Sequence, residues 1–214
     1  GMWREDLAAR YDSVVSRIRK READGERIAG KGFLNHFPAR GSSAGSLFFV
    51  SNDGRDYQDL DIMRRNGTGR VERIVSNVSS RFGVSPDGVR ICFARRTRSN
   101  DRGYARDDLF LHTLATGKQK RLTHGLRASN PSWSPDGARI ACVVTGGGSH
   151  RIAVVDAATG EHAFVTEASD GTEFMALSWG RDGILATRFD GASRDIVLVD
   201  PASGAVAPRA ATDA

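Results

Sequence analysis

The strongest constraint on the fold is a turn phrase that recurs along the chain. "SPDG" stands at residues 85–88 and 134–137, and "RDG" at 181–183 is a reduced copy. The turn glycines are 49 and 46 residues apart (137 − 88 and 183 − 137). In such a turn proline presets φ, aspartate bonds the nearby backbone and glycine supplies a positive φ. The residues assigned to these turns are Pro86, Asp87, Gly88, Pro135, Asp136, Gly137, Asp182 and Gly183.

Two further markers repeat in the same order as the turn phrase. One is the set "RIVSN", "RLTHG" and "FVTEA", and the other is a small-residue turn ending at Gly69, Gly117, Gly160 or Gly204. The third unit shows four short strands, "NPSW", "ARIACVV", "RIAVVDA" and "EHAFVT", with "TGGGSH" as a flexible loop. Four antiparallel strands in about 45 residues are typical of a β-propeller blade. An aromatic residue near the end of the first strand (Phe82, Trp133, Trp179) is expected to pack between blades.

The fold class that follows is all-β, a β-propeller of four four-stranded blades. We place the blades at about 35–76, 77–123, 124–165 and 166–214. The preceding "ERIAGKG" at 26–32 has the pattern of one more last strand, so the propeller region spans 26–214. In residues 1–25, Leu7, Tyr11, Val14 and Ile18 recur at helical spacing, which predicts a short amphipathic helix over about 3–22. That helix either packs on the propeller edge or belongs to a preceding domain.

The sequence leaves the closure of the propeller open. Four blades can form a small closed ring, with residues 26–32 as a closing strand. Alternatively, the ring is partial and leaves two apolar end faces exposed, which are covered by a second copy or by a longer parent chain. We expect a partial propeller and self-association through the exposed blade faces.

Composition and charge limit the classes of partner that this chain is expected to bind. The 214 residues carry a formal charge of +5, and the basic residues are dispersed, so no nucleic-acid partner is expected. No stretch approaches the roughly 18 apolar residues of a spanning helix, so no membrane insertion is expected, and no apolar leader is visible in this chain. Cys92 and Cys142 stand in apolar stretches with opposite strand parity, which predicts two buried free thiols and no disulfide.

The motifs of common enzyme classes are missing from the sequence. There is no Gly-x-Ser-x-Gly, no His-Glu-x-x-His and no phosphate-binding loop, so we expect no catalytic residue. "SNDGRDYQDLD" clusters acids but lacks the order of a calcium loop, and no Cys/His spacing suggests zinc. No metal and no cofactor are therefore expected. Asp61, Asp108 and Asp195 recur at the third strand of a blade and are interpreted as inter-blade hydrogen-bonding groups.

The best candidate for function is a surface. "RRTRSNDRGYARDD" at 95–108 is interpreted as the longest loop, on the face where propellers usually bind ligands. Arginine and tyrosine are enriched at interface hot spots, so an acidic peptide or protein is the expected partner. The candidate binding residues are Arg40, Arg95, Arg96, Arg98, Arg102, Tyr104, Arg106, Arg127 and His150.

Several phrases carry a family resemblance. "SPDGARIACVV", "RIAVVDAATG", "SNDGRDYQDLDIMRRNGTG" and "KRLTHG" resemble the WD-like propeller repeats of TolB-like proteins, over about residues 26–206. The resemblance implies a periplasmic or secreted, non-catalytic scaffold for protein–protein interaction. Similar propellers are also attached to peptidases and other hydrolases, so the alternative is a module that gates or orients substrate, with the catalytic domain outside this chain. TolB-like propellers have six blades, whereas this chain shows four.

Overall fold

The computed structural model describes residues 35–41, 45–52, 60–79, 81–99 and 104–210, of which positions 98, 99, 104 and 210 are described by their backbone alone. The chain separates into two compact units, residues 1–30 and 31–214. All described residues belong to the second unit. The predicted helix at 3–22 and the predicted strand at 26–32 lie outside the described residues.

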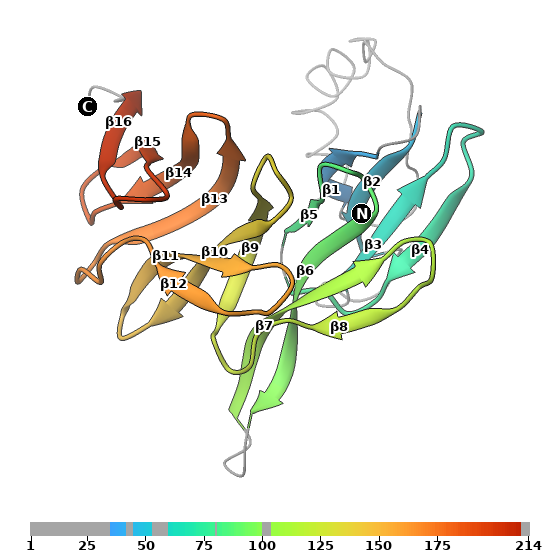
Figure 1. Ribbon diagram of the computed structural model, residues 1–214, viewed down its shortest axis with the longest axis horizontal. Helices are drawn as coiled ribbons and strands as arrows, with labels where there is room; N and C mark the ends of the chain where they lie inside the picture. Colours follow the sequence, from blue (N-terminus) through green and yellow to red (C-terminus); the bar gives the residue numbers. More distant parts are fainter. Residues whose placement is uncertain (1–34, 42–44, 53–59, 80, 100–103, 211–214) are drawn as a thin grey trace, which may run out of the picture. The chain divides into compact units, whose positions relative to one another are not determined.

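The described residues form sixteen strands in four antiparallel sheets, and each sheet follows the chain order (Figure 1). This confirms the predicted all-β fold of four four-stranded blades. Blade 1 consists of β1 (Asn35–Arg40), β2 (Leu47–Ser51), β3 (Asp61–Arg65) and β4 (Val71–Val75). Blade 2 consists of β5 (Phe82–Val84), β6 (Arg90–Ser99), β7 (Tyr104–Thr113) and β8 (Gln119–Arg121). Blade 3 consists of β9 (Ala128–Trp133), β10 (Arg139–Gly146), β11 (Ser149–Asp156) and β12 (His162–Phe164). Blade 4 consists of β13 (Glu173–Gly180), β14 (Gly183–Phe189), β15 (Arg194–Val199) and β16 (Val206–Ala210).

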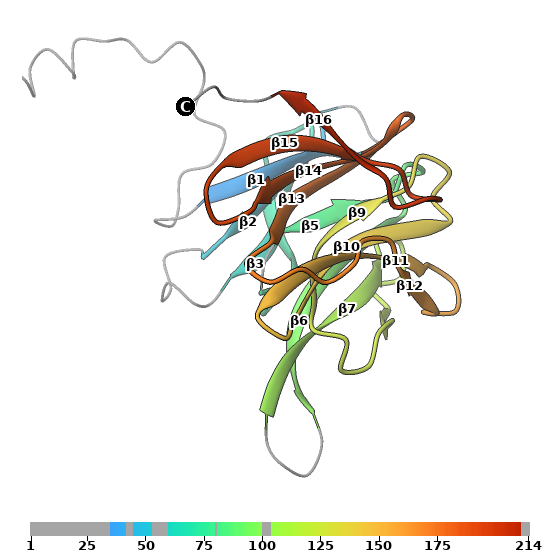
Figure 2. The same cartoon turned by 90° about the vertical axis from the view of Figure 1, so that its left-hand side faces the viewer.

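The blades pack in sequence order through their first strands. β5 contacts both β1 and β9, and β9 also contacts β13. In Figure 2, β5 and β9, the first strands of the two middle blades, lie side by side, in agreement with their contacts. The first strands are therefore the innermost, and the fourth strands form the outer edges of the blades.

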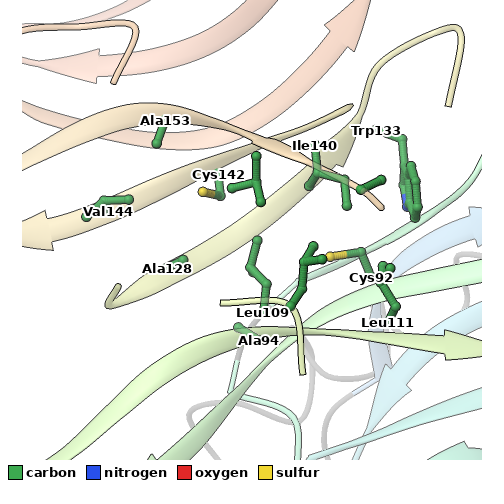
Figure 3. Close-up of a cluster of buried hydrophobic side chains, with 13 residues drawn as sticks. Cys92, Ala94, Leu109, Leu111, Ala128, Trp133, Ile140, Cys142, Val144 and Ala153 are labelled. Atoms are coloured by element: carbon green, nitrogen blue, oxygen red, sulfur yellow. The ribbon is translucent and has the colours of Figure 1, made fainter. Parts of the chain in front are cut away.

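Three buried apolar clusters hold neighbouring blades together, one at each junction. We call the side of a blade that meets the next blade its forward face, and the opposite side its rear face. At the junction of blades 2 and 3 (Figure 3), the forward face of blade 2 meets the rear face of blade 3. Packing of the two faces removes apolar surface from water, which stabilises the folded state by roughly 25 cal/mol per Å² buried. The cluster includes Cys92, Ala94, Leu109 and Leu111 from blade 2, and Ala128, Trp133, Ile140, Cys142, Val144 and Ala153 from blade 3.

Trp133 joins blades 2 and 3 by a directional contact as well as by packing. Its indole Nε1 donates a hydrogen bond to the Gly83 carbonyl oxygen at 3.0 Å. A Cβ atom at Gly83 would lie 3.0 Å from Trp133 Cδ1, so the glycine allows the close approach. The Arg90 guanidinium lies 4.7 Å from the Trp133 ring and donates to the Gly137 carbonyl at 3.2 Å. The expected inter-blade aromatic is thus also hydrogen-bonded across the junction.

The two complete SPDG turns are built alike. In the first, Gly88 N donates to Ser85 O at 2.8 Å with φ +68° at Gly88, and Asp87 Oδ1 accepts from Val89 N at 3.0 Å. The hydrogen bond from Ser85 Oγ and the one from the Val89 amide hold the pKa of Asp87 below its usual range. The second turn repeats these bonds through Ser134, Asp136, Gly137 and Ala138.

Two segments predicted as loops are strands. Residues 95–99 and 104–108 belong to β6 and β7, which pair continuously from Arg90–Thr113 to Ser99–Tyr104. The prediction of a long loop at 95–108 was therefore wrong for these residues, because backbone pairing extends the hairpin in spite of its polar sequence. In "TGGGSH", β10 and β11 are joined by a tight turn at Gly147 and Gly148, whose φ angles are +60° and +77°. Positive φ at both central residues is typical of a type I′ hairpin turn.

The two cysteines are free and fully buried, as predicted. Their strand parity does turn them to opposite faces, Cys92 forward on blade 2 and Cys142 rearward on blade 3. Those two faces are packed against each other, so both thiols belong to the same cluster (Figure 3). Burial raises the pKa of Cys142 to about 12 and that of Cys92 well above its ordinary value.

Candidate functional site

Asp108, on the third strand of blade 2, is a structural anchor, whereas the contacts of Asp195 with Ser193 and Arg188 stay within blade 4. The buried Asp108 accepts hydrogen bonds from Arg121 at 2.7 Å and from Thr123 Oγ1 at 2.9 Å. It also accepts the backbone amides of Gly125 and Leu126, in the connection to blade 3. Burial alone raises the pKa of Asp108, but these hydrogen bonds outweigh it and the net pKa is lowered. The carboxylate therefore stays ionised and fixes the path between two blades.

The same position carries different chemistry in other blades. In blade 1, Asp61 pairs with Arg73 at 2.7 Å, as Asp108 pairs with Arg121. In blade 3 the equivalent strand position is Arg151, whose guanidinium lies 3.5 Å from the centre of the Phe164 ring. A cation over an aromatic ring thus replaces the ion pair.

Arg95, a predicted binding residue, is engaged within the fold. Its guanidinium donates to the carbonyl oxygens of Ser76 at 2.8 Å and Asn77 at 3.2 Å, in the connection from blade 1. It also lies 5.0 Å from the Phe93 ring and 5.2 Å from the Phe110 ring. Burial lowers the pKa of Arg95. Arg95 therefore joins blades 1 and 2 on the rear side of β6.

Three other predicted arginines come together. Arg96 and Arg106 from the long β6–β7 hairpin and Arg127, just before β9, line one cavity of about 260 Å³. We call this site the arginine pocket; its remaining lining residues are Ala105, Asp107, Ser129 and Thr145. The pocket is assembled from two blades, because Arg127, Ser129 and Thr145 belong to blade 3 or to the connection before it.

The charge of the arginine pocket is poorly compensated. Its lining residues include three arginines and one aspartate, Asp107. Asp107 already accepts a hydrogen bond from Ser79 at 2.8 Å and lies 3.9 Å from Arg96, whose side chain is 73% exposed. Among the described residues, the buried Nε of Arg106 has no hydrogen-bond partner. The excess of arginine over acid makes the pocket suited to a ligand that brings acceptor oxygens.

Arg127 is held in an unusual conformation. Its φ is +60°, a region that residues other than glycine seldom adopt. Its carbonyl accepts the amide of Thr145 at 3.2 Å, which fixes the connection against β10. The positive φ therefore determines the direction in which the Arg127 side chain projects from the backbone.

Arg40 and His150, the other predicted residues whose side chains are described, are not among the residues that line the arginine pocket. Arg40 is exposed at the end of β1, in blade 1. His150 pairs with Thr145 across β10 and β11, its amide donates to the Thr172 carbonyl at 3.1 Å, and its buried Nδ1 has no partner. Arg98 and Tyr104 lie on the hairpin strands, where only their backbone is described. Arg102 lies outside the described residues.

A second concavity was not found from the sequence. It is a groove of about 630 Å³ at the turn end of the innermost strands, and we call it the axial groove. Its walls come from the first strand of every blade, and half of the lining residues are proline or aromatic. The lining includes Phe37, Pro38, Arg81, Phe82, Pro86, Pro131, Trp133, Pro135, Trp179 and Arg181.

Bulges in the first strands shape the axial groove. Register shifts follow His36 in β1, interrupt β9 between Ser129 and Ser132, and interrupt β13 between Met175 and Ser178. A residue with positive φ stands in each bulge: Phe37, Asn130 and Ala176. A bulge redirects the side chains that follow it. The aromatic residue that recurs before each turn phrase (Phe82, Trp133, Trp179) was the available sequence signal for this groove.

Other kinds of site are not found in the part of the chain that the structure describes. Within the described ranges, no three histidine, cysteine, aspartate or glutamate side chains gather where they could hold a metal ion. Among the same residues, no helix has the length and apolar character needed to cross a membrane.

Comparison with known proteins supports the fold. No protein-family model matches the sequence, and no curated protein is significantly similar to it. Among solved structures, TolB from Acinetobacter baumannii superposes with a TM-score of 0.66 at 22% identity, over 87% of this chain and 46% of its own. A TolB from Agrobacterium tumefaciens gives 0.63 at 20% identity, over 77% of this chain and 60% of its own. The fold is that of a TolB-like β-propeller.

The same propeller arrangement occurs inside longer enzymes. A puromycin-hydrolyzing peptidase from Mycobacterium tuberculosis gives a TM-score of 0.65 at 15% identity. The match covers 86% of this chain and 30% of the peptidase. The chain thus spans 46–60% of the two TolB proteins and under a third of this peptidase. At these identities the similarity establishes the TolB-like fold and no activity.

Proposed function

We propose that this chain is a non-catalytic TolB-like scaffold that binds an acidic peptide or an acidic protein surface in the arginine pocket. The observation that carries the proposal is the convergence of Arg96, Arg106 and Arg127 from two blades on one cavity. Guanidinium groups bind carboxylates by paired hydrogen bonds, and the lining holds three arginines against one acidic residue. A cell-envelope location, which the TolB-like resemblance implies, is part of this proposal.

The test is a binding titration with a fluorescein-labelled hexaglutamate peptide, followed by anisotropy. Arg106→Ala and Arg127→Ala should each weaken binding about tenfold, and raising the salt concentration should weaken it further. Arg40→Ala is the matched control, since Arg40 is an exposed arginine outside the pocket and its loss should leave affinity unchanged. Equal effects of all three substitutions, or equal binding of hexalysine, would contradict the assignment.

A second candidate is a propeller module of a larger hydrolase, where it would gate or orient substrate. It is supported by the match to the propeller part of a puromycin-hydrolyzing peptidase. The complete open reading frame distinguishes the two candidates, because the second requires a catalytic domain fused to this chain. Joined to such a domain, Arg106→Ala would change KM for acidic substrates, whereas the scaffold proposal expects a change in affinity for a separate polypeptide.

A further inference from the structure

The forward faces of blades 2 and 3 share four equivalent positions. The registers align them, because the pairs Trp133–Ile140 and Trp179–Ile184 occupy the same place in blades 3 and 4, as Val84–Ile91 does in blade 2. All four positions are apolar in both blades and are buried or half-buried against the next blade. They are Cys92, Ala94, Leu109 and Leu111 in blade 2, and Ala141, Val143, Ile152 and Val154 in blade 3.

Blade 4 is apolar at three of these positions and carries a threonine at the fourth, and its environment is different. The four residues are Leu185, Thr187, Ile196 and Leu198, which we call the blade 4 forward face. Leu185 is 39% exposed and Ile196 is 50% exposed, whereas their blade 3 equivalents Ala141 and Ile152 are fully buried. The blade 4 forward face is therefore mostly apolar, like the faces between blades. Among the described residues, however, no blade packs against it.

The rows across this face contain no charge near its middle. One row reads Ser178, Leu185, Leu198 and Ala207 across the four strands, and the next reads Met175, Thr187 and Ile196. The row at the rim carries Glu173 and Arg194 on either side of Phe189. Blade faces that meet water are normally polar, and this face is mostly apolar.

We propose that the blade 4 forward face packs against the same face of a second copy of this chain around a two-fold axis. The axis runs along β14, so that β13 of each copy lies over β15 of the other. Met175 then meets the partner's Ile196, and Glu173 meets the partner's Arg194, with each contact made twice. Such an interface is self-complementary, as two-fold symmetry requires, and it is independent of the arginine pocket.

The pattern of charge favours a second copy over another occupant. The rim of this face carries one acid on β13 and one base on β15, which lie on opposite sides of β14. Rotation about β14 exchanges these strands and therefore pairs unlike charges. Two apolar sheet faces also pack well on each other, with nearly aligned strands about 10 Å apart. A second copy thus satisfies both the apolar rows and the charged rim.

The first measurement is the solution mass of the full chain by light scattering over about 1–100 µM protein. We expect a mass approaching twice the 23.1 kDa of the chain. Ile196→Lys should raise the dissociation constant about a hundredfold, because it buries an unpaired cation in the interface. Val89→Lys is the matched control, since Val89 is 45% exposed in the first turn of blade 2 and should leave the mass unchanged. A monomer throughout this range, or equal effects of both variants, would overturn the proposal.

The charged rim tests the geometry. Glu173→Arg and Arg194→Glu should each raise the dissociation constant about fivefold or more, since each brings like charges together, and the double variant should restore dimerisation. Leu185→Cys should form a disulfide between copies under mild oxidation, because β14 lies on the axis. Val89→Cys, off the proposed interface, should not. Open-ended oligomers, or a failure of the double charge variant to recover, would exclude the two-fold arrangement.

Discussion

Blades 3 and 4 carry equivalent side chains on their forward faces and expose them very differently. Ile152 is fully buried, whereas Ile196 at the same place in the next blade is 50% exposed. Both lie on the third strand opposite an equivalent residue of the second, Val143 or Thr187. The difference arises from the neighbouring sheet, because blade 4 covers Ile152 and no described blade follows Ile196. Burial in a repeat fold is thus set by position in the array as much as by residue type.

The largest expected effect comes from placing a charge at these two positions. Ile152→Lys should lower the free energy of unfolding by more than about 4 kcal/mol, because it buries an unpaired ammonium group. Ile196→Lys should change it by less than about 0.5 kcal/mol at protein concentrations where the chain is a monomer. Urea denaturation checks both values. Losses of similar size would show that the two faces are equally covered.

Next in size is the loss of a buried anchor between blades. Asp108→Asn should lower the free energy of unfolding by about 3 kcal/mol, since it leaves the Arg121 guanidinium and two backbone amides of the connection poorly satisfied. Asp182→Asn, at an exposed turn of the end blade, should cost less than about 0.5 kcal/mol. The same urea experiment measures both. Equal effects would remove the distinction between an inter-blade aspartate and a turn aspartate.

The Asp108 contribution should also depend on pH in a defined direction. Its pKa is lowered in the folded state, so the stabilisation is complete above the unfolded pKa of about 3.9 and is lost as the pH falls through the folded pKa. The stability difference between the wild type and Asp108→Asn should therefore be constant from about pH 7 to 5 and shrink below about pH 4. Denaturation curves across this range measure it, and a difference that grows in acid would contradict the assignment.

A smaller effect is expected from the tryptophans at equivalent places in blades 3 and 4. Trp133→Phe should cost about 1.5 kcal/mol, since it removes the indole hydrogen bond to Gly83 and leaves space between blades 2 and 3. Trp179 is only half-buried, so Trp179→Phe should cost about 0.5 kcal/mol. Thermal unfolding of both variants checks the order, and a larger loss at Trp179 would reverse it.

The smallest expected effect is a difference in reactivity between thiols at equivalent positions of different blades. Native Cys92 and Cys142 should not react with a thiol reagent at about pH 8, because burial keeps both pKa values high and the reagent out. Leu185→Cys places a thiol in blade 4 at the position of Cys92, where it should react at the rate of an ordinary exposed cysteine at low protein concentration. Absorbance at the reagent's product band follows both. Rapid reaction of the native thiols would mean that blades 2 and 3 separate readily.

Much of the fold could be predicted because the Ser-Pro-Asp-Gly turn is determined by interactions among a few neighbouring residues. Pro86, Asp87 and Gly88 specify their turn locally, and repetition of that turn was enough to count the blades. The length of the β6–β7 hairpin was not predictable from its polar sequence. It is stabilised by backbone pairing and by cross-strand pairs such as Arg96 with Asp107.

The candidate site was predicted in part for a similar reason. Arg96, Arg106 and Arg127 were placed on one surface, and the structure brings them together. Arg95 was grouped with them, yet it lies on the other side of β6, since a shift of one residue changes the face of a strand. The axial groove depends on residues about 46 positions apart and on bulges, which no local pattern in the sequence specifies.

The hydrogen bond of Trp133 to Gly83 also makes this side chain an intrinsic optical reporter. Its indole is 5% exposed and bonded across two blades, so its emission should be blue-shifted while blades 2 and 3 remain in contact. Separation of these blades would admit water to the indole and shift its emission to the red, even with every strand still paired. Because the chain also carries Trp3 and Trp179, a Trp3→Phe/Trp179→Phe background leaves Trp133 as the single tryptophan. In that background, a stopped-flow trace of the shift would time the opening of one junction separately from the melting of the sheets.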